Sequence, residues 1–326
     1  MVLAPIERLP LELLQPIFIA ADHNIALVDA SSHIAARLSL PYIYFSTCNY
    51  FLTEVRGTRA KQSAAQTRIF ASKWLTWTFF KSWILRRFGS SGCLCDRTVD
   101  EGCFDAQWPP DFEDATTMVF SRSHLPRLAF VKGRIPRKLL LGPWTQEKVE
   151  FLQFVLWITS MSVDWENAET AKAAIDGRRQ AMLDGYLPAV ELFNHNRRLG
   201  KAASLETLLF AVLEAGCDRS IVYDTLLTAR MWNPPRYSEE LHEWCDTQAL
   251  HGNPKGEWLR KKLDEWLVGD YLNPNTGNYM GGPDDQLWIH NLQWNKVRKA
   301  SELCVPDNLC GNSNCRSGFA EYDIQD

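Results

Sequence analysis

The sequence predicts an all-α fold, and three observations support this class. Apolar residues recur at helical spacing from the first segment onward. After residue 143, residues that begin and end helices follow one another closely. The strict apolar-polar alternation of strands is scarce. The chain has 326 residues, 46% hydrophobic and 23% charged, which is typical of a globular protein of about two domains.

The first 40 residues are expected to be helical. The stretch 9–21 carries apolar residues three and four apart, namely Leu9, Leu13, Leu14, Ile17 and Phe18. Pro10 suits a first helical turn, whereas Pro16 predicts a kink or a later start. Asp29 or Ser31 is expected to begin a further helix at 32–38, which carries Ile34 and Leu38.

Residues 59–88 predict one longer helix. Its apolar stripe consists of Phe70, Trp74, Trp77, Ile84 and Phe88. Further aromatic residues lie opposite, so we expect a strut packed between two partners. Residues 51–92 carry eight Lys or Arg against Glu54 alone. Binding of nucleic acid or a membrane surface is the alternative, and the two-sided apolar pattern argues against it.

The remaining chain predicts a loop and then six helices. Residues 89–115 are rich in Gly, Ser, Pro and acids, while 118–131 fits a short strand or a covering segment. The six helices are expected to start at Thr145, at Glu166, at Ser204 with an end at Gly216, at Asp218, at Ser238 with an end at Gly252, and at Asn253. Residues 286–297 fit either a helix or a strand, and the tail after Val305 is polar.

A weak internal repeat occurs in this helical part. Gly185 and Gly216 are 31 residues apart, and Val190 and Ile221 have the same offset from them. Ankyrin repeats have a period of about 33 residues and contribute a helix pair each. Their T-P-L-H signature is missing here, so two ordinary helical hairpins fit equally well.

The sequence offers little for catalysis, and no enzyme activity or cofactor is expected. Phosphate-binding glycine loops and the G-x-S-x-G nucleophile motif are absent. His242-Glu243 lacks the second His of a zinc protease, because Asp246 stands there. A zinc-dependent enzyme remains a remote alternative on the residues Cys93, Cys95, Cys103, His124, Cys310 and Cys315, whose spacing fits poorly.

Charge and cysteine content limit the other function classes. A net charge of −4 gives no general attraction to nucleic acid, and no apolar run reaches the roughly 18 residues of a membrane helix. The first residues do not fit a secretory leader. Nine cysteines, an odd number, favour reduced thiols in the cytoplasm or nucleus. Arg197, Arg198 and Lys201 form a local basic cluster suited to an acidic or phosphorylated target, or to a helix C-terminus.

The N-terminus resembles an F-box in the order LP, EL, IF at residues 9–18, followed by Leu27, Ala30-Ser31, Ile34 and Leu38. The rest of the chain resembles a fungal group of F-box-like proteins in SKWLTWTFFKSW (72–83), GPWTQEKVEFLQFVLW (142–157), ELFNHNRRLGKA (191–202), EAGCDRSIVYDTLLTAR (214–230) and GNPKGEWLRKKL (252–263). The sequence departs from many F-boxes at Pro16 and in the third helix, which lacks a Trp.

This resemblance implies a substrate-recognition subunit of an SCF-type cullin–RING ubiquitin ligase. The N-terminal unit, a three-helix F-box, would bind the Skp adaptor, and the helical C-terminal region would hold a protein target. The residues expected to face the adaptor or to support that face are Leu9, Pro10, Leu13, Leu14, Ile17, Phe18, Ile34 and Leu38. We expect Leu13 and Phe18 to anchor the contact.

The resemblance and the patterns together divide the chain into five parts. These are an F-box-like domain at 1–50, a Trp-rich linker helix at 51–92, a loop segment at 93–140, a helical interaction domain at 141–300 and a tail at 301–326. The alternative function is a non-catalytic ankyrin-like scaffold whose F-box-like helices are purely structural.

Overall fold

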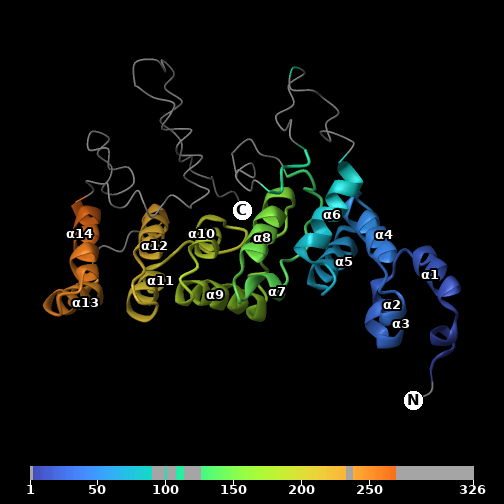
Figure 1. Cartoon of the computed structure of the whole chain (residues 1–326), viewed down its shortest axis with the longest axis horizontal. Helices are drawn as coiled ribbons and strands as arrows, with labels where there is room; N and C mark the ends of the chain where they lie inside the picture. The colour runs from blue at the N-terminus through green and yellow to red at the C-terminus, as the bar shows by residue number, and fades with distance from the viewer. Residues whose placement is uncertain (1–2, 90–99, 101–107, 114–125, 233–237, 269–326) are drawn as a thin grey trace.

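The computed structural model is an elongated array of helices with the N-terminal unit at one end (Figure 1). It describes residues 3–89, 100, 108–113, 126–232 and 238–268. Fourteen α-helices and no strand occur in these parts of the chain, which confirms the all-α class. The expected helix or strand at 286–297, the tail, Cys93, Cys95, Cys103, His124, Cys310 and Cys315 lie outside the described residues.

The N-terminal unit consists of the 3₁₀ turn η1 (Pro5–Arg8) and the helices α1 (Leu11–Ala20), α2 (Ile25–Ala30) and α3 (Ser32–Arg37). Helix α1 begins directly after Pro10 and continues through Pro16. Pro16 is exposed, and because it has no amide proton, the carbonyl group of Glu12 four residues earlier lacks its helical donor. The unit has a small core of its own, made of Leu14, Phe18, Ile34, Leu38 and Ile43.

Helix α4 (Pro41–Leu52) joins this unit to the rest of the protein. Its first turn contributes Ile43 to the small core, and its second half contributes Cys48 and Leu52 to the main core. The two cores therefore meet within α4. The domain boundary expected at residue 50 falls inside this helix.

The single helix expected at 59–88 is wrong, because the chain forms two helices, α5 (Arg59–Ala71) and α6 (Trp77–Phe88). Ser72 ends α5 in extended conformation, and the Thr76 side chain accepts a hydrogen bond from the amide of Phe79 to begin α6. Lys138 stabilises the break between the two helices, because its ammonium group donates to the carbonyls of Ser72 and Leu75. The expected two-sided packing is confirmed for α6, which lies between α4 and α8.

Residues 126–136 form a covering segment rather than a strand of a sheet. Isolated parallel bridges join Leu128 to Thr159 and Arg134 to Ser162. Val131 and Ile135 of this segment are buried in the main core. The short helix α7 (Arg137–Leu140) follows it, so the loop expected at 93–140 contains ordered structure near its end.

The C-terminal part is a stack of helix pairs. The second helices of the pairs are α8 (Gln146–Ile158), α10 (Leu187–His195), α12 (Arg219–Trp232) and α14 (Pro254–Val268). The first helices are α7, α9 (Ala168–Leu183), α11 (Leu205–Leu209) with the π-helical turn η3 (Phe210–Glu214), and α13 (Glu239–Leu250). Helix α10 packs against α8 and α12, while α9 packs against α7 and η3. Neighbouring pairs thus bury one continuous core.

The expected helix starts are confirmed by their capping bonds. Side-chain oxygens of Thr145, Asn167, Ser204 and Ser238 accept from the third amide of the following helix. Asp218 accepts from Ile221 and Asn253 from Lys255. The second helix begins at Ala168, slightly later than expected, because Asn167 is its N-cap.

The turn inside each of the last three pairs contains a left-handed glycine. The φ angles are 65° at Gly185, 76° at Gly216 and 69° at Gly252. Val190 and Ile221, at equal offsets from the first two glycines, are both buried. The repeated hairpin predicted from Gly185 and Gly216 is therefore present as a stacked helix pair.

Candidate functional site

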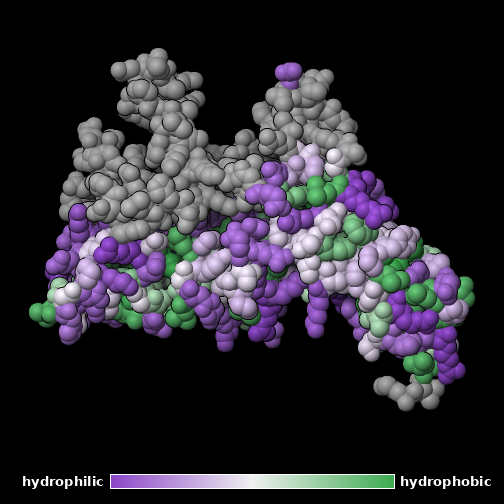
Figure 2. All heavy atoms as spheres, viewed as in Figure 1, coloured by the Kyte–Doolittle hydropathy of each residue, from purple (hydrophilic) through white to green (hydrophobic). Residues whose placement is uncertain are grey.

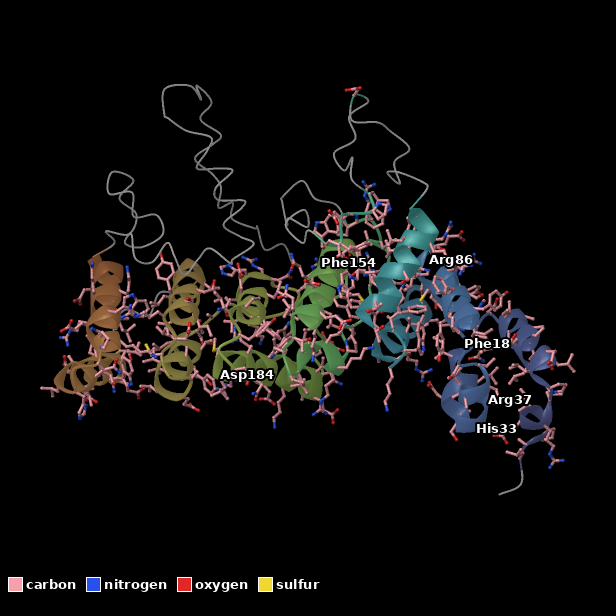
Figure 3. The ribbon with its side chains drawn as sticks, viewed as in Figure 1. Phe18, His33, Arg37, Arg86, Phe154 and Asp184 are labelled. Atoms are coloured by element: carbon pink, nitrogen blue, oxygen red, sulfur yellow. The ribbon has the colours of Figure 1, made fainter. Side chains whose placement is uncertain are left out.

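Helix α1 presents two different faces. Leu14 and Phe18 point into the small core and are 1% and 2% exposed. Leu13 and Ile17, on the adjacent face, are 53% and 41% exposed. Two large apolar side chains, four residues apart, thus form an outward ridge on α1, which we call the α1 ridge. Figure 3 shows Phe18 on the inner side of the N-terminal unit.

The eight residues predicted for adaptor binding differ in their exposure to solvent. Pro10, Leu13 and Ile17 are exposed, and Leu9 is half-buried. The four buried members are Leu14, Phe18, Ile34 and Leu38. Of the two expected anchors, Leu13 is thus on the surface, whereas Phe18 is enclosed in this structure. The ring of Phe18 is enclosed by the unit's own helices. It therefore packs on the inner face of α1, away from the α1 ridge, and stabilises the position of that helix.

A polar staple fixes α1 relative to α3. The Ser31 hydroxyl donates to the Glu7 carboxylate, and the Arg37 guanidinium donates to the carbonyls of Glu7 and Leu9. The hydrogen bond from Ser31 and that from the Ala4 amide lower the pKa of Glu7. Ser31 also caps α3 through the amide of Ile34. The staple holds the entry to α1 at a fixed position beside α3, where Figure 3 places Arg37.

His23 connects the N-terminal unit to α4. Its ring lies edge-on to Phe18 and stacked on Tyr50, with centroid separations of 5.4 and 4.8 Å. Its Nε2 atom lies 2.7 Å from the hydroxyl of Ser46. Burial lowers the pKa of His23. The residue therefore packs as an uncharged aromatic ring that orients the unit.

The basic cluster expected to bind a target has a different role at Arg198. Its guanidinium donates to the carbonyls of Leu156 and Thr159 at the C-terminal end of α8. Burial lowers the pKa of this residue. Lys201 lies over the ring of Trp165 at 5.1 Å, and Arg197 is exposed. Two of the donors of Arg198 thus cap the C-terminal end of α8.

A buried polar network joins α10 to α12, and sequence reasoning missed it. Asp224 accepts from Asn194 at 2.8 Å and lies 2.5 Å from Nε2 of His195. The Thr228 hydroxyl lies 3.4 Å from the same Nε2 atom. A catalytic triad needs the carboxylate and the hydroxyl on opposite ring nitrogens. Here the carboxylate and the hydroxyl both lie at Nε2 of His195. The network is therefore a hydrogen-bonded contact between α10 and α12.

Three cysteines lie within the described parts of the chain, and all three are buried free thiols, namely Cys48, Cys217 and Cys245. Burial raises the pKa of all three, to about 12 for Cys217 and about 11 for Cys245. They are therefore thiols rather than thiolates near neutral pH. No group of three or more potential metal ligands occurs among the residues that the structure describes.

Comparison with known proteins gives no match: no family model, curated protein or solved structure matches this chain. Within the described ranges, no helix combines the length and apolar character needed to cross a membrane.

Proposed function

We propose that the protein is a non-catalytic substrate receptor of an SCF-type ubiquitin ligase. In this role the N-terminal unit binds the Skp adaptor, and the stacked helix pairs hold a protein target in the cytoplasm or nucleus. The complex would act by raising the concentration of the target near the ubiquitin-conjugating enzyme. The LP, EL, IF order of residues 9–18 supports this proposal together with the structure of the unit.

One observation carries the proposal: α1 exposes Leu13 and Ile17 on a unit that already has its own core. Isolated exposed leucines are common, but a leucine and an isoleucine side by side on one face of a helix provide an apolar contact surface. The unit lies at the end of the array, where a large partner can approach it without contacting the helix pairs (Figure 1). Both features suit an adaptor-docking module.

A second candidate is a protein-interaction scaffold whose N-terminal unit only closes the end of the array. The tight connection through His23, Ser46 and α4 supports this reading. Terminal units with a polar outer face are a general need of stacked helix arrays. The α1 ridge is the feature that this second candidate leaves unexplained.

Co-purification separates the two functions. The full chain and a Skp adaptor are co-expressed with an affinity tag on the chain and analysed by gel filtration. An adaptor that elutes with the chain in a one-to-one complex supports the receptor. An adaptor that elutes alone contradicts it and favours the scaffold.

A further inference from the structure

The α4–α6 region carries a continuous strip of half-buried aromatic rings. Tyr44 of α4 stacks on Trp74 with a centroid separation of 4.2 Å and an interplanar angle of 4°. Phe79 of α6 meets Tyr44 edge-on at 6.1 Å and Trp74 edge-on at 5.3 Å. Phe45 continues the strip at 5.0 Å from Phe79. We call these four residues the aromatic strip.

Cations flank the aromatic strip at both ends. The guanidinium of Arg86 lies over the ring of Phe45, 4.8 Å from its centroid, and its side chain remains exposed. Figure 3 shows Arg86 on α6 beside α4. Lys73 is adjacent in sequence to Trp74 at the other end of the strip and is also exposed. One cation is thus packed on the strip, and a second follows from the position of Lys73 beside Trp74 in the chain.

Very few carboxylates are available to neutralise this surface from its own elements. Between residues 41 and 89 the only acid is Glu54, and it is paired with Arg56 at 2.8 Å. From the neighbouring elements, Asp29 pairs with Arg68, Glu113 pairs with Lys81, and Glu147 and Glu150 accept from Thr78 and Trp77 on the α8 side of α6. The positive potential at Lys73 and Arg86 is therefore not neutralised by a described carboxylate.

We propose that the aromatic strip and its flanking cations form a docking site for an acidic protein segment. An apolar side chain of the segment would lie on the Tyr44–Trp74 pair, and carboxylates on either side would meet Arg86 and Lys73. Aromatic residues and Arg are the residue types that contribute most to protein interfaces. A planar guanidinium already held over a ring presents its donor edge to a carboxylate at little entropic cost.

A nucleic acid fits this surface less well. The Tyr44 and Trp74 rings are stacked on each other, which leaves no gap to receive a base between them. The contact proposed here is independent of the α1 ridge and stands whether or not the chain binds a Skp adaptor.

The test uses a fluorescein-labelled dodecapeptide with a central Leu-Phe pair flanked on each side by Glu and Asp, titrated with the full chain in a fluorescence anisotropy experiment. The controls are the same peptide with Gln and Asn in place of its acids, and a 12-nucleotide oligothymidylate. We expect the acidic peptide to bind at least about tenfold more tightly than either control, with an affinity that falls as salt rises. Equal or tighter binding of either control overturns the proposal, as does absence of acidic-peptide binding.

Charge reversal locates the site. Arg86→Glu and Lys73→Glu should each weaken acidic-peptide binding at least about fivefold. The matched control is Arg59→Glu, which changes the net charge equally at the start of α5, roughly 20 Å from the end of α5 that precedes Lys73. It should change the affinity less than about twofold. Equal effects at all three positions indicate only a general electrostatic attraction and overturn the assignment. Arg86→Gln, with circular dichroism as a folding check, replaces any reversal variant that does not fold.

Discussion

Leu13 and Phe18, five residues apart on α1, point in nearly opposite directions: Leu13 is 53% exposed, whereas Phe18 is 2% exposed. At about 100° per residue, five positions correspond to about 140° around the helix. Ile17 is only about 40° from Leu13 and is exposed with it. The helix therefore supports its own small core with one face and presents the α1 ridge with the other.

Gly216→Val should destabilise the helical region. The φ of Gly216 is 76°, and a Cβ atom there would meet nothing within 4 Å, so the cost comes from the backbone alone. A β-branched residue in this conformation costs about 1–3 kcal/mol. Urea denaturation followed by circular dichroism measures the change. Gly216→Asn should cost less, since Asn tolerates left-handed angles. Equal stability of the Val variant and the wild type would contradict this interpretation.

Gly177→Ala should destabilise the protein for a different reason. A Cβ atom at Gly177 would lie 1.7 Å from the carbonyl oxygen of Leu140, so α7 would have to move away from α9. We expect a loss of about 1–3 kcal/mol, as for other overpacked sites. In an open helix the same substitution stabilises by about 1 kcal/mol. The sign of the change in thermal unfolding therefore tests the close approach of α7, and a stabilised variant would refute it.

Arg198→Met should destabilise the fold more than Arg197→Met does. Arg198 donates to the carbonyls of Leu156 and Thr159, and Met would leave these carbonyl groups without their donor. Loss of a charged hydrogen-bond partner for a buried group costs about 1–3 kcal/mol. Arg197 is exposed and serves as the matched control. Chemical denaturation of both variants checks the difference. Similar losses in the two would show that Arg198 has no special capping role.

Lys138 should make stability depend on alkaline pH. Burial lowers the pKa of Lys138 to about 8, against about 10.4 in an unfolded chain. Between these values the unfolded state binds the more protons, so the free energy of unfolding rises with pH. Because Lys138 is only partly buried, we expect a contribution of about 1–3 kcal/mol.

The comparison with Lys138→Met isolates this contribution from that of other groups. Urea denaturation of both proteins at about pH 7.5 and about pH 9.5 gives the difference in free energy of unfolding at each pH. The wild type should gain stability relative to the variant at the higher pH. A difference that does not change with pH, or that changes in the opposite direction, would show that the ammonium group is stabilised by the Ser72 and Leu75 carbonyls instead.

Local signals in the sequence predicted most of the helix boundaries in the C-terminal part. Thr145, Ser204 and Ser238 act as N-caps, and Gly216 has the left-handed angle expected of it. Capping depends on a few neighbouring residues, so it can be recognised without tertiary information. The stacking of the pairs was visible only as a faint repeat, because the inter-pair contacts do not recur as a fixed motif.

Features that depend on distant contacts could not be predicted. The break between α5 and α6 is stabilised by Lys138, which is more than 60 residues away, and the helical stripe alone favoured continuity. The roles of Arg198 and Asp224 likewise depend on partners in other helices. At α1, the apolar positions were recognised, but periodicity did not decide which of Leu13 and Phe18 faces outward. The packing of α3 and α4 decides it.

The measurement that tests the central claim most directly is calorimetric titration of the Skp adaptor into the full chain and two variants. One variant carries Leu13→Asp and Ile17→Asp on the α1 ridge. The control, Leu250→Asp, changes an 87% exposed leucine at the far end of the array; Figure 2 shows the surface along that array. We expect the wild type and the control to bind equally and the ridge variant to bind at least about thirtyfold more weakly, about 2 kcal/mol. Absence of binding by the wild type, or equal binding by all three folded proteins, would contradict the proposed role.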